Sequence, residues 1–159
     1  MSKLSTSLII GTAAIIGLGA GALWSNIEGR QAQAQPVAAM ASLAPRVFSL
    51  CHTGGGINCV VDGDTVWVDG VKIRVADIDA PETHPPRCDQ EAELGRRATE
   101  RLLDLVNAGP FEMRAFDGRD ADRYGRKLRV LLRNGQSLGD QLVREGLART
   151  WSGRREPWC

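Results

Sequence analysis

Valine and isoleucine recur at every second position in two short stretches that are separated by Asp69-Gly70. The apolar positions are Val66, Val68, Val71, Ile73 and Val75. A period of two residues is typical of half-buried strands. Asp69-Gly70 suits the two-residue turn that matches strand twist, because glycine tolerates positive φ. The pattern therefore predicts a β-hairpin.

A second period, of three and four residues, runs from Glu91 to Asn107 and predicts an amphipathic helix. Its apolar positions are Leu94, Ala98, Leu102, Leu105 and Val106. Asp89 is the expected N-cap, and Gly109-Pro110 should end the helix. We expect the charged residues of this segment to face solvent.

The C-terminal part of the sequence predicts two further strands, at 111–116 and 128–132, joined by a charged loop. Asn134-Gly135 is the expected turn after the second of them. The four residues 137–140 (SLGD) resemble a capping box with Asp in place of Glu. A short helix should therefore follow as far as Gly146, and residues 147–151 are expected to return to the sheet.

The N-terminal residues 1–27 carry one early charge, Lys3, followed by a long uncharged stretch. This stretch is long enough for a signal peptide and marginal for a membrane span, which needs roughly 20 apolar residues. Ala32-Gln33-Ala34 offers a small-x-small cleavage sequence. Either alternative, signal peptide or membrane anchor, places the rest of the chain outside the cytoplasm, periplasmic, secreted or anchored, because the positive end stays inside.

The 159 residues suffice for a single domain, which we assign to 51–159, after a flexible Gln/Ala/Pro-rich linker at 28–50. The formal net charge of +1 does not by itself indicate a nucleic-acid binder. After Cys51, however, the basic side chains are arginines except for Lys72 and Lys127. Arginine favours geometric recognition of phosphate over diffuse attraction.

Four cysteines, Cys51, Cys59, Cys88 and Cys159, follow the export segment. An even number of cysteines in an exported protein indicates disulfides, and three connectivities are open. We predict Cys51–Cys59, across a glycine-rich loop, and Cys88–Cys159. A zinc site would need ligand pairs of the type C-x-x-C or H-x-x-x-H, which the sequence lacks. Free buried thiols are disfavoured in an oxidising compartment.

Candidate chemistry gathers at the ends of the predicted hairpin. Asp62 and Asp64 precede the first strand, Arg74 lies on the second, and Asp79 and Glu82 follow it. Hard oxygen ligands of this kind suit Ca²⁺ or Mg²⁺, and a guanidinium beside them suits phosphate. The alternative for Asp62 and Asp64 is an ordinary turn. A nearby carboxylate, at position 77, is expected to be a solvated loop residue.

Three short sequences resemble the staphylococcal nuclease (thermonuclease) family. They are DGDT at 62–65, R-x-x-x-x-D-x-P-E at 74–82 and D-x-Y-G-R at 122–126, and the resemblance covers about 60–150. It implies an α+β, mainly β fold: a five-stranded OB-fold barrel with two helices. It also implies Ca²⁺-dependent hydrolysis of phosphodiester bonds in DNA and RNA.

The resemblance further implies the roles of individual residues at a metal site. Asp64 and Asp79 correspond to the carboxylates that bind Ca²⁺, and the backbone carbonyl of Ala80 to a third ligand. Position 80 is threonine in the type member, so a carbonyl contact survives and a hydroxyl contact does not. Asp62 would lie next to these ligands without binding the metal itself.

For the substrate, the resemblance implies that Glu82 activates or orients the attacking water and that Arg74 and Arg126 hold the phosphate. Tyr124 corresponds to a tyrosine that contacts the terminal phosphate. The alternative for Arg126 is a surface ion pair with Asp122. The family tyrosines that flank the base are not evident, so either Trp151 or Trp158 could supply a stacking surface.

Two other functions are open. A non-catalytic OB-fold module of the cell envelope would bind an oligonucleotide or an envelope polymer, and it would not need the metal and phosphate residues. A membrane-tethered interaction domain would depend on the N-terminal segment alone. Because the metal and phosphate residues are all present, we predict a nuclease with DNA and RNA as substrates. We expect the domain to be monomeric and to contact a membrane only if the N-terminal segment is retained.

Overall fold

A computed structural model describes residues 46–52 and 56–159. The predicted signal peptide or anchor and most of the predicted linker lie outside these residues. No helix within the described ranges has the length and apolar character needed to cross a membrane. Phe48, at the end of the predicted linker, is buried, and its ring packs against that of Phe111 at 5.8 Å. The packed part of the chain therefore begins before Cys51.

The predicted hairpin is confirmed by strands β3 (Thr65–Val68) and β4 (Val71–Val75), which pair antiparallel. The turn residues Asp69 and Gly70 both have positive φ, at 50° and 79°, as a two-residue hairpin turn requires. The strand β4 is buried along its second half, including the arginine at position 74. Both faces of this strand are therefore covered.

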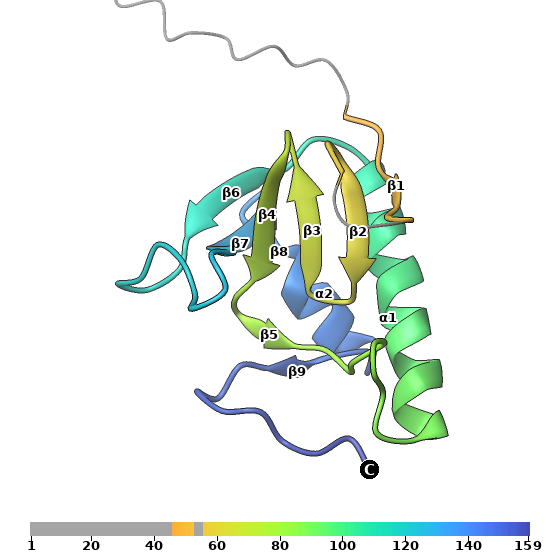
Figure 1. Cartoon of the computed structure of the whole chain (residues 1–159). Helices are drawn as coiled ribbons and strands as arrows, with labels where there is room; N and C mark the ends of the chain where they lie inside the picture. The colour runs from red at the N-terminus through yellow and green to blue at the C-terminus, as the bar shows by residue number, and fades with distance from the viewer. Residues whose placement is uncertain (1–45, 53–55) are drawn as a thin grey trace, which may run out of the picture. The chain divides into compact units, whose positions relative to one another are not determined.

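Strand pairing produces one larger sheet and one small one (Figure 1). The larger sheet has the order β1-β2-β3-β4-β7-β6, with β8 beside β7. Its further strands are β1 (Ser49–Leu50), β2 (Cys59–Asp62), β6 (Glu112–Ala115), β7 (Lys127–Arg133) and β8 (Gln136–Ser137). The small sheet pairs β5 (Ile78–Asp79) with β9 (Arg149–Thr150). The strands expected at 111–116 and 128–132 are present, β6 shorter and β7 longer than predicted. The segment 147–151 was expected to return to the main sheet, but its strand β9 pairs with β5 in the small sheet.

The predicted closed five-stranded barrel is not formed within the described residues. The hydrogen-bonded path ends at β1 on one side and at β6 on the other, and no pairing joins these edges. After β4 the chain leaves the larger sheet, and β5 pairs with β9. The fold is nevertheless mainly β with two helices, as expected.

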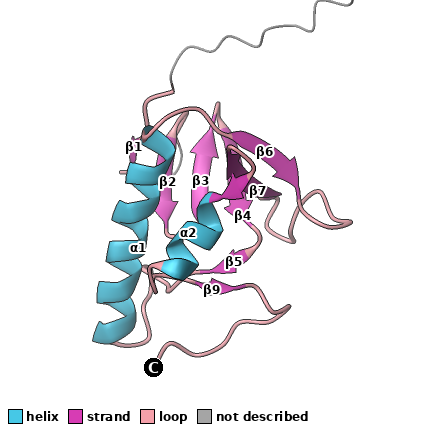
Figure 2. Cartoon of the chain, turned by 180° about the vertical axis from the view of Figure 1, so that it is seen from behind, coloured by secondary structure: helices cyan, strands magenta, loops and turns pink. Residues whose placement is uncertain are grey.

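Helix α1 (Asp89–Asn107) confirms the predicted amphipathic segment, although its N-cap is Cys88 rather than Asp89. The sulfur of Cys88 accepts the backbone N–H of Glu91 at 3.5 Å. Helix α2 (Leu138–Arg144) begins at the predicted cap, because the Ser137 hydroxyl accepts the backbone N–H of Asp140. Seen from behind, α1 runs beside β2 and α2 lies across the back of the larger sheet (Figure 2).

The core lies between these helices and the sheet. Leu102 of α1, Leu131 of β7 and Leu142 of α2 are fully buried in it. Burying a side chain of this size contributes about 1.5–3 kcal/mol. Both predicted disulfides are present, Cys51–Cys59 beside β2 and Cys88–Cys159 between the start of α1 and the C-terminus. The second one fixes the final segment beside the loop that follows β5.

Candidate functional site

The site is built around the buried guanidinium of Arg74, on β4. Arg74 forms an ion pair with Asp64, its Nη2 lies 3.7 Å from Asp79 Oδ1, and Nη2 also donates to the carbonyl of Ile78 at 3.3 Å. A buried charge of this kind requires anionic partners. The structure thus brings together two carboxylates and an arginine that the sequence places before, on and after the hairpin.

Asp64 accepts hydrogen bonds from two donors besides its ion pair with Arg74. The hydroxyl of Thr65 donates to Oδ1 at 3.0 Å, and the backbone N–H of Ala80 donates to Oδ2 at 3.1 Å. Asp64 and Asp79 are each only 3 % exposed. The loop before β3 and the chain after β5 therefore meet at the buried Asp64 carboxylate, which Ala80 contacts through its backbone N–H.

Asp79 has an oxygen that this protein does not satisfy by hydrogen bonding. Its Oδ1 is buried and accepts no hydrogen bond, and the Nε of Arg155 lies 3.4 Å away. Burial raises the pKa of Asp79, against the opposing effect of the positive charge of Arg155. Burial, and then the charge of Asp64, raise the pKa of Asp62 to about 7. Burial is the main cause of both shifts, and a bound cation would oppose them by favouring the charged carboxylates.

The donor set at this point consists of carboxylate oxygens and backbone, which suits a hard cation. The buried Oδ1 of Asp79, which accepts no hydrogen bond, is the observation that fits such an ion. Among residues 46–52 and 56–159, however, no group of three or more His, Cys, Asp or Glu side chains is arranged to hold a metal. A metal here would therefore need ligands beyond the two aspartates, such as a backbone carbonyl.

Glu82 lies at the edge of this cluster, on the loop between β5 and α1, and forms an ion pair with Arg155. Its backbone N–H donates to Glu91 Oε1 at 3.4 Å, and that of Arg87 donates to Glu91 Oε2 at 2.6 Å. Glu91 is 1 % exposed, although it is a carboxylate in the first turn of α1. One buried side chain therefore fixes the loop that carries Glu82.

The same loop packs very closely against α1 at Gly95. A Cβ atom at this position would lie 2.9 Å from the carbonyl oxygen of Pro81 and 3.1 Å from that of Glu82. Only glycine leaves enough space for this approach. Neither Gly95 nor Glu91 was identified from the sequence. Both lie within the predicted helix, and the helical period indicates which apolar residues are buried but gives no signal for a glycine or a glutamate.

Arg126 and Asp122 form more than a surface ion pair. Asp122 accepts the Arg126 Nε at 2.7 Å and the backbone N–H groups of Tyr124 and Arg126 at 2.9 and 3.0 Å. Burial opposes ionisation of Asp122, but these donors outweigh it and hold its pKa below the usual range. Arg126 Nη1 in turn donates to Thr65 at 3.3 Å, so this loop is connected to the carboxylate cluster.

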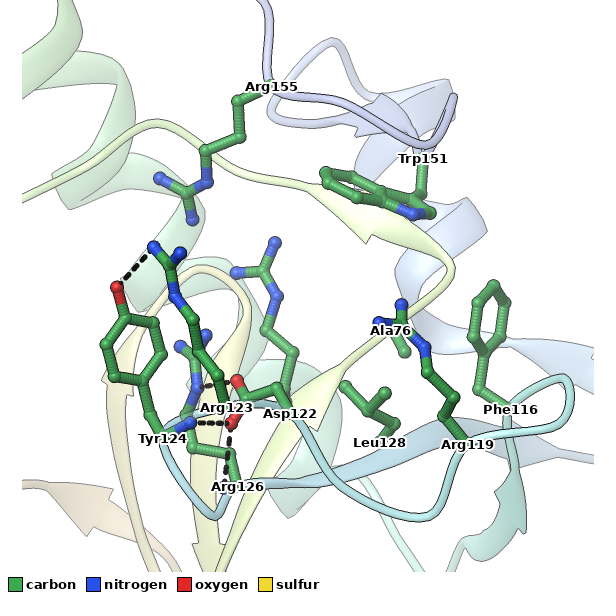
Figure 3. Close-up of a pocket in the computed structure, with 11 residues that line it drawn as sticks. Ala76, Phe116, Arg119, Asp122, Arg123, Tyr124, Arg126, Leu128, Trp151 and Arg155 are labelled. Carbon is green, nitrogen blue, oxygen red and sulfur yellow. Dashed lines mark hydrogen bonds and ion pairs between the residues drawn. The ribbon is translucent and has the colours of Figure 1, made fainter.

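A pocket of about 250 Å³ opens beside these residues (Figure 3). Its lining combines five arginines with apolar and aromatic side chains. The lining arginines are Arg74, Arg119, Arg123, Arg126 and Arg155, and the others include Ala76, Phe116, Tyr124, Leu128 and Trp151. Such a surface can bind an anion and a flat ring side by side. Net charge did not reveal it, because acidic residues beside the pocket, such as Asp122 and Asp64, balance these arginines in the total.

The two tryptophans considered for stacking have different positions. Trp151 lines the pocket, whereas the ring of Trp158 lies 3.7 Å from the Arg149 guanidinium. Tyr124 is exposed, and its hydroxyl accepts a hydrogen bond from Arg123 at 2.6 Å. Asp77 is not the solvated carboxylate that we expected, because it is half-buried and accepts the Ser137 hydroxyl at 2.5 Å.

Arg155 is a further site residue that the sequence did not predict. It lies in the C-terminal segment and points into the pocket opposite Arg123 and Tyr124 (Figure 3). Besides Glu82, its guanidinium faces Asp79 and, at 3.9 Å, Asp64. The sequence separation between Arg155 and these carboxylates carries no periodic signal that could have connected them.

Comparison with known proteins identifies the family to which the chain is similar. A family described as staphylococcal nuclease homologue matches residues 72–157. Endonuclease YncB of Bacillus subtilis is 38 % identical over 94 residues, which is 56 % of this chain and 44 % of that protein. The SPbeta prophage-derived endonuclease YokF of the same species is also 38 % identical over 94 residues, covering 56 % of this chain and 31 % of that one.

A micrococcal nuclease of Shigella flexneri is 32 % identical over 131 residues, which is 74 % of this chain and 68 % of that protein. The chain thus covers less than half the length of the two Bacillus relatives and about two thirds of the Shigella protein. The family match at 72–157 spans the residues that line the pocket, from Arg74 to Arg155, whereas Asp64 lies before it.

Proposed function

Since the chain belongs to the staphylococcal nuclease family, we propose that it hydrolyses phosphodiester bonds of DNA and RNA with the help of Ca²⁺. One observation carries the proposal. Arg74 and Arg126 converge, through Asp64 and Thr65, on the carboxylate cluster to which Glu82 also belongs. Hydrolysis of a phosphodiester needs positive charge at the phosphate and a polarised water beside it.

The two arginines are suited to hold the phosphate. Arg74 is fixed by Asp64, and Arg126 is fixed by Asp122 and Thr65, so neither has to be ordered when substrate binds. Each guanidinium has five N–H groups, which leaves donors for phosphate oxygens. Donors fixed in advance stabilise the charge that develops in the transition state at little cost of reorganisation.

Glu82 is the proposed proton acceptor for the attacking water. Its loop is fixed by Glu91, and its carboxylate is partly exposed, so water can reach it. Asp64, Asp79 and the carbonyl of Ala80 would hold the metal. When bound, Ca²⁺ would polarise the phosphate and lower the pKa of a nearby water. Every other contribution comes from side chains of this chain.

The pocket beside the arginines is the proposed place of a nucleobase. Trp151 and Phe116 offer aromatic surfaces, and Ala76 and Leu128 offer apolar ones. Bases stack on aromatic side chains without strong sequence preference, at about 1–3 kcal/mol per base. Tyr124, which is exposed, is the proposed contact for a terminal phosphate. This combination favours a single-stranded or locally opened substrate.

A purified full-length chain with its disulfides intact tests the proposal. We expect cleavage of single-stranded DNA and of RNA in Ca²⁺, loss of cleavage with chelator, and recovery when Ca²⁺ is restored. Asp79→Asn should abolish most of the activity. Asp120→Asn is the matched control, since Asp120 pairs on the surface with Lys127 and Arg129. Cleavage that persists with chelator would refute the metal dependence.

A non-catalytic oligonucleotide-binding module is the second candidate. It is favoured by one observation: the Arg155 guanidinium already lies among the carboxylates that a metal would need. Such a module would bind single-stranded DNA without cutting it, and the same assay separates the two functions. For either function, we propose export across the membrane by the N-terminal segment and a monomeric domain.

A further inference from the structure

Arg155 places one guanidinium against three carboxylates at once. It forms an ion pair with Glu82, its Nε lies 3.4 Å from Asp79 Oδ1, and its Nη2 lies 3.9 Å from Asp64 Oδ2. We propose that Arg155 is an internal counter-ion that competes with a divalent cation for these carboxylates. The inference rests on the proposed metal-dependent function.

The charges of the cluster explain the competition. The three carboxylates together with Arg74 carry a formal net charge of −2. One divalent cation neutralises this charge, whereas the single charge of Arg155 only halves it. Both cannot stay in place, because like charges a few ångströms apart in a partly buried site repel each other strongly. A cation that enters must therefore displace the guanidinium.

The C-terminal segment holds Arg155 over the site from both sides. Before it, β9 pairs with β5. After it, Cys159 is bonded to Cys88, and the Arg149 guanidinium donates to the carbonyl of Pro157 at 3.1 Å. The Arg155 side chain is nevertheless 36 % exposed. It can therefore leave the carboxylates by rotating into solvent, while the backbone segment stays fixed.

The test is an equilibrium calorimetric titration of the full-length chain with Ca²⁺. We compare the wild type with Arg155→Gln and with Arg154→Gln as the matched control. Arg154 carries the same charge, is about 80 % exposed, and pairs only with Glu156 among the described residues. Arg155→Gln should bind Ca²⁺ about ten- to a hundredfold more tightly, the factor typical of one contact to a charged group. Arg154→Gln should stay within about twofold of wild type.

A second pair of variants tests the tether. Cys88→Ser with Cys159→Ser frees the C-terminal segment, so Ca²⁺ binding should tighten in the wild-type background. In the Arg155→Gln background, the two cysteine replacements should leave Ca²⁺ affinity unchanged, since they act on Ca²⁺ binding only through Arg155. Circular dichroism establishes that each variant is folded.

The outcomes separate this inference from the proposed function. If Arg155→Gln binds Ca²⁺ no more tightly than Arg154→Gln, the competition is refuted, while Ca²⁺-dependent cleavage by the wild type still supports the nuclease. If neither the wild type nor Arg155→Gln binds Ca²⁺, the metal site is wrong and both proposals fail.

Discussion

Glu91 offers a demanding test of how this site is positioned. Its carboxylate is buried and accepts two backbone N–H groups of the Glu82 loop, from Arg87 at 2.6 Å and from Glu82 at 3.4 Å. Glu91→Gln keeps the size of the side chain but turns an NH₂ group toward one of these donors. Glu91→Ala removes both acceptors.

The expected losses follow from the two hydrogen bonds. A hydrogen bond to a charged group contributes about 1.5–3 kcal/mol to the free energy of unfolding, which we take for the short bond from Arg87. The long bond from Glu82 should contribute less, about 0.5–1.5 kcal/mol. Glu91→Gln should therefore lower the free energy of unfolding by about 1.5–3 kcal/mol and Glu91→Ala by about 2–4.5 kcal/mol. Typical domains are stable by about 5–15 kcal/mol, so both variants should remain folded.

Urea unfolding measures the stability, and single-turnover cleavage of single-stranded DNA measures the effect on Glu82. Glu93→Gln is the control, because Glu93 is exposed on the same helix and should change stability by no more than about 0.5 kcal/mol. We expect Glu91→Gln to lower the cleavage rate while substrate affinity is retained. A loss of stability with an unchanged rate would show that Glu91 supports the fold without positioning Glu82.

Three further outcomes are expected. Gly95→Ala should lower the cleavage rate and reduce the free energy of unfolding by about 1–3 kcal/mol, because the added Cβ would lie 2.9 Å from the Pro81 carbonyl oxygen. An unchanged rate and melting temperature would contradict this. Asp122→Asn should destabilise the protein at pH 7. The folded-state pKa of Asp122 is lowered below its usual value of 3.8, so the difference in stability between variant and wild type should disappear as the pH falls through that pKa. A difference in stability that persists in acid would refute the assignment. Replacing Cys88 and Cys159 by serine should lower the free energy of unfolding by about 2–4 kcal/mol, and an unchanged urea midpoint would disprove it.

Local patterns in the sequence predicted the hairpin and both helices, because alternation, helical period and turn residues act over a few positions. The sequence also predicted that carboxylates gather near Arg74 at the ends of the hairpin, and Asp64 and Asp79 do lie beside it. The disulfides could be proposed because few pairings were open. These features depend on neighbours in the chain or on simple chemistry.

Other features depend on contacts between distant segments, for which the sequence has no local signal. Whether a barrel closes depends on pairing between the outermost strands, and β1 and β6 remain unpaired with each other. Glu91 lies at a polar position of a helix, where solvent exposure is the usual outcome, and only the packed loop makes it buried. Arg155 reaches the carboxylates because β9 pairs with β5 and Cys159 bonds to Cys88.

The central claim is that Glu82 acts on the chemical step of phosphodiester hydrolysis, and one measurement tests it most directly. Single-turnover cleavage of single-stranded DNA in Ca²⁺ is measured beside equilibrium binding of the same DNA, for the wild type and Glu82→Gln. We expect the variant to lose a factor of about 10²–10⁴ in rate, as for a lost general base. Its affinity should stay within a few-fold, because the carboxylate acts mainly in the transition state. Cleavage by Glu82→Gln at the wild-type rate, or binding by the wild type without any cleavage, would contradict the account.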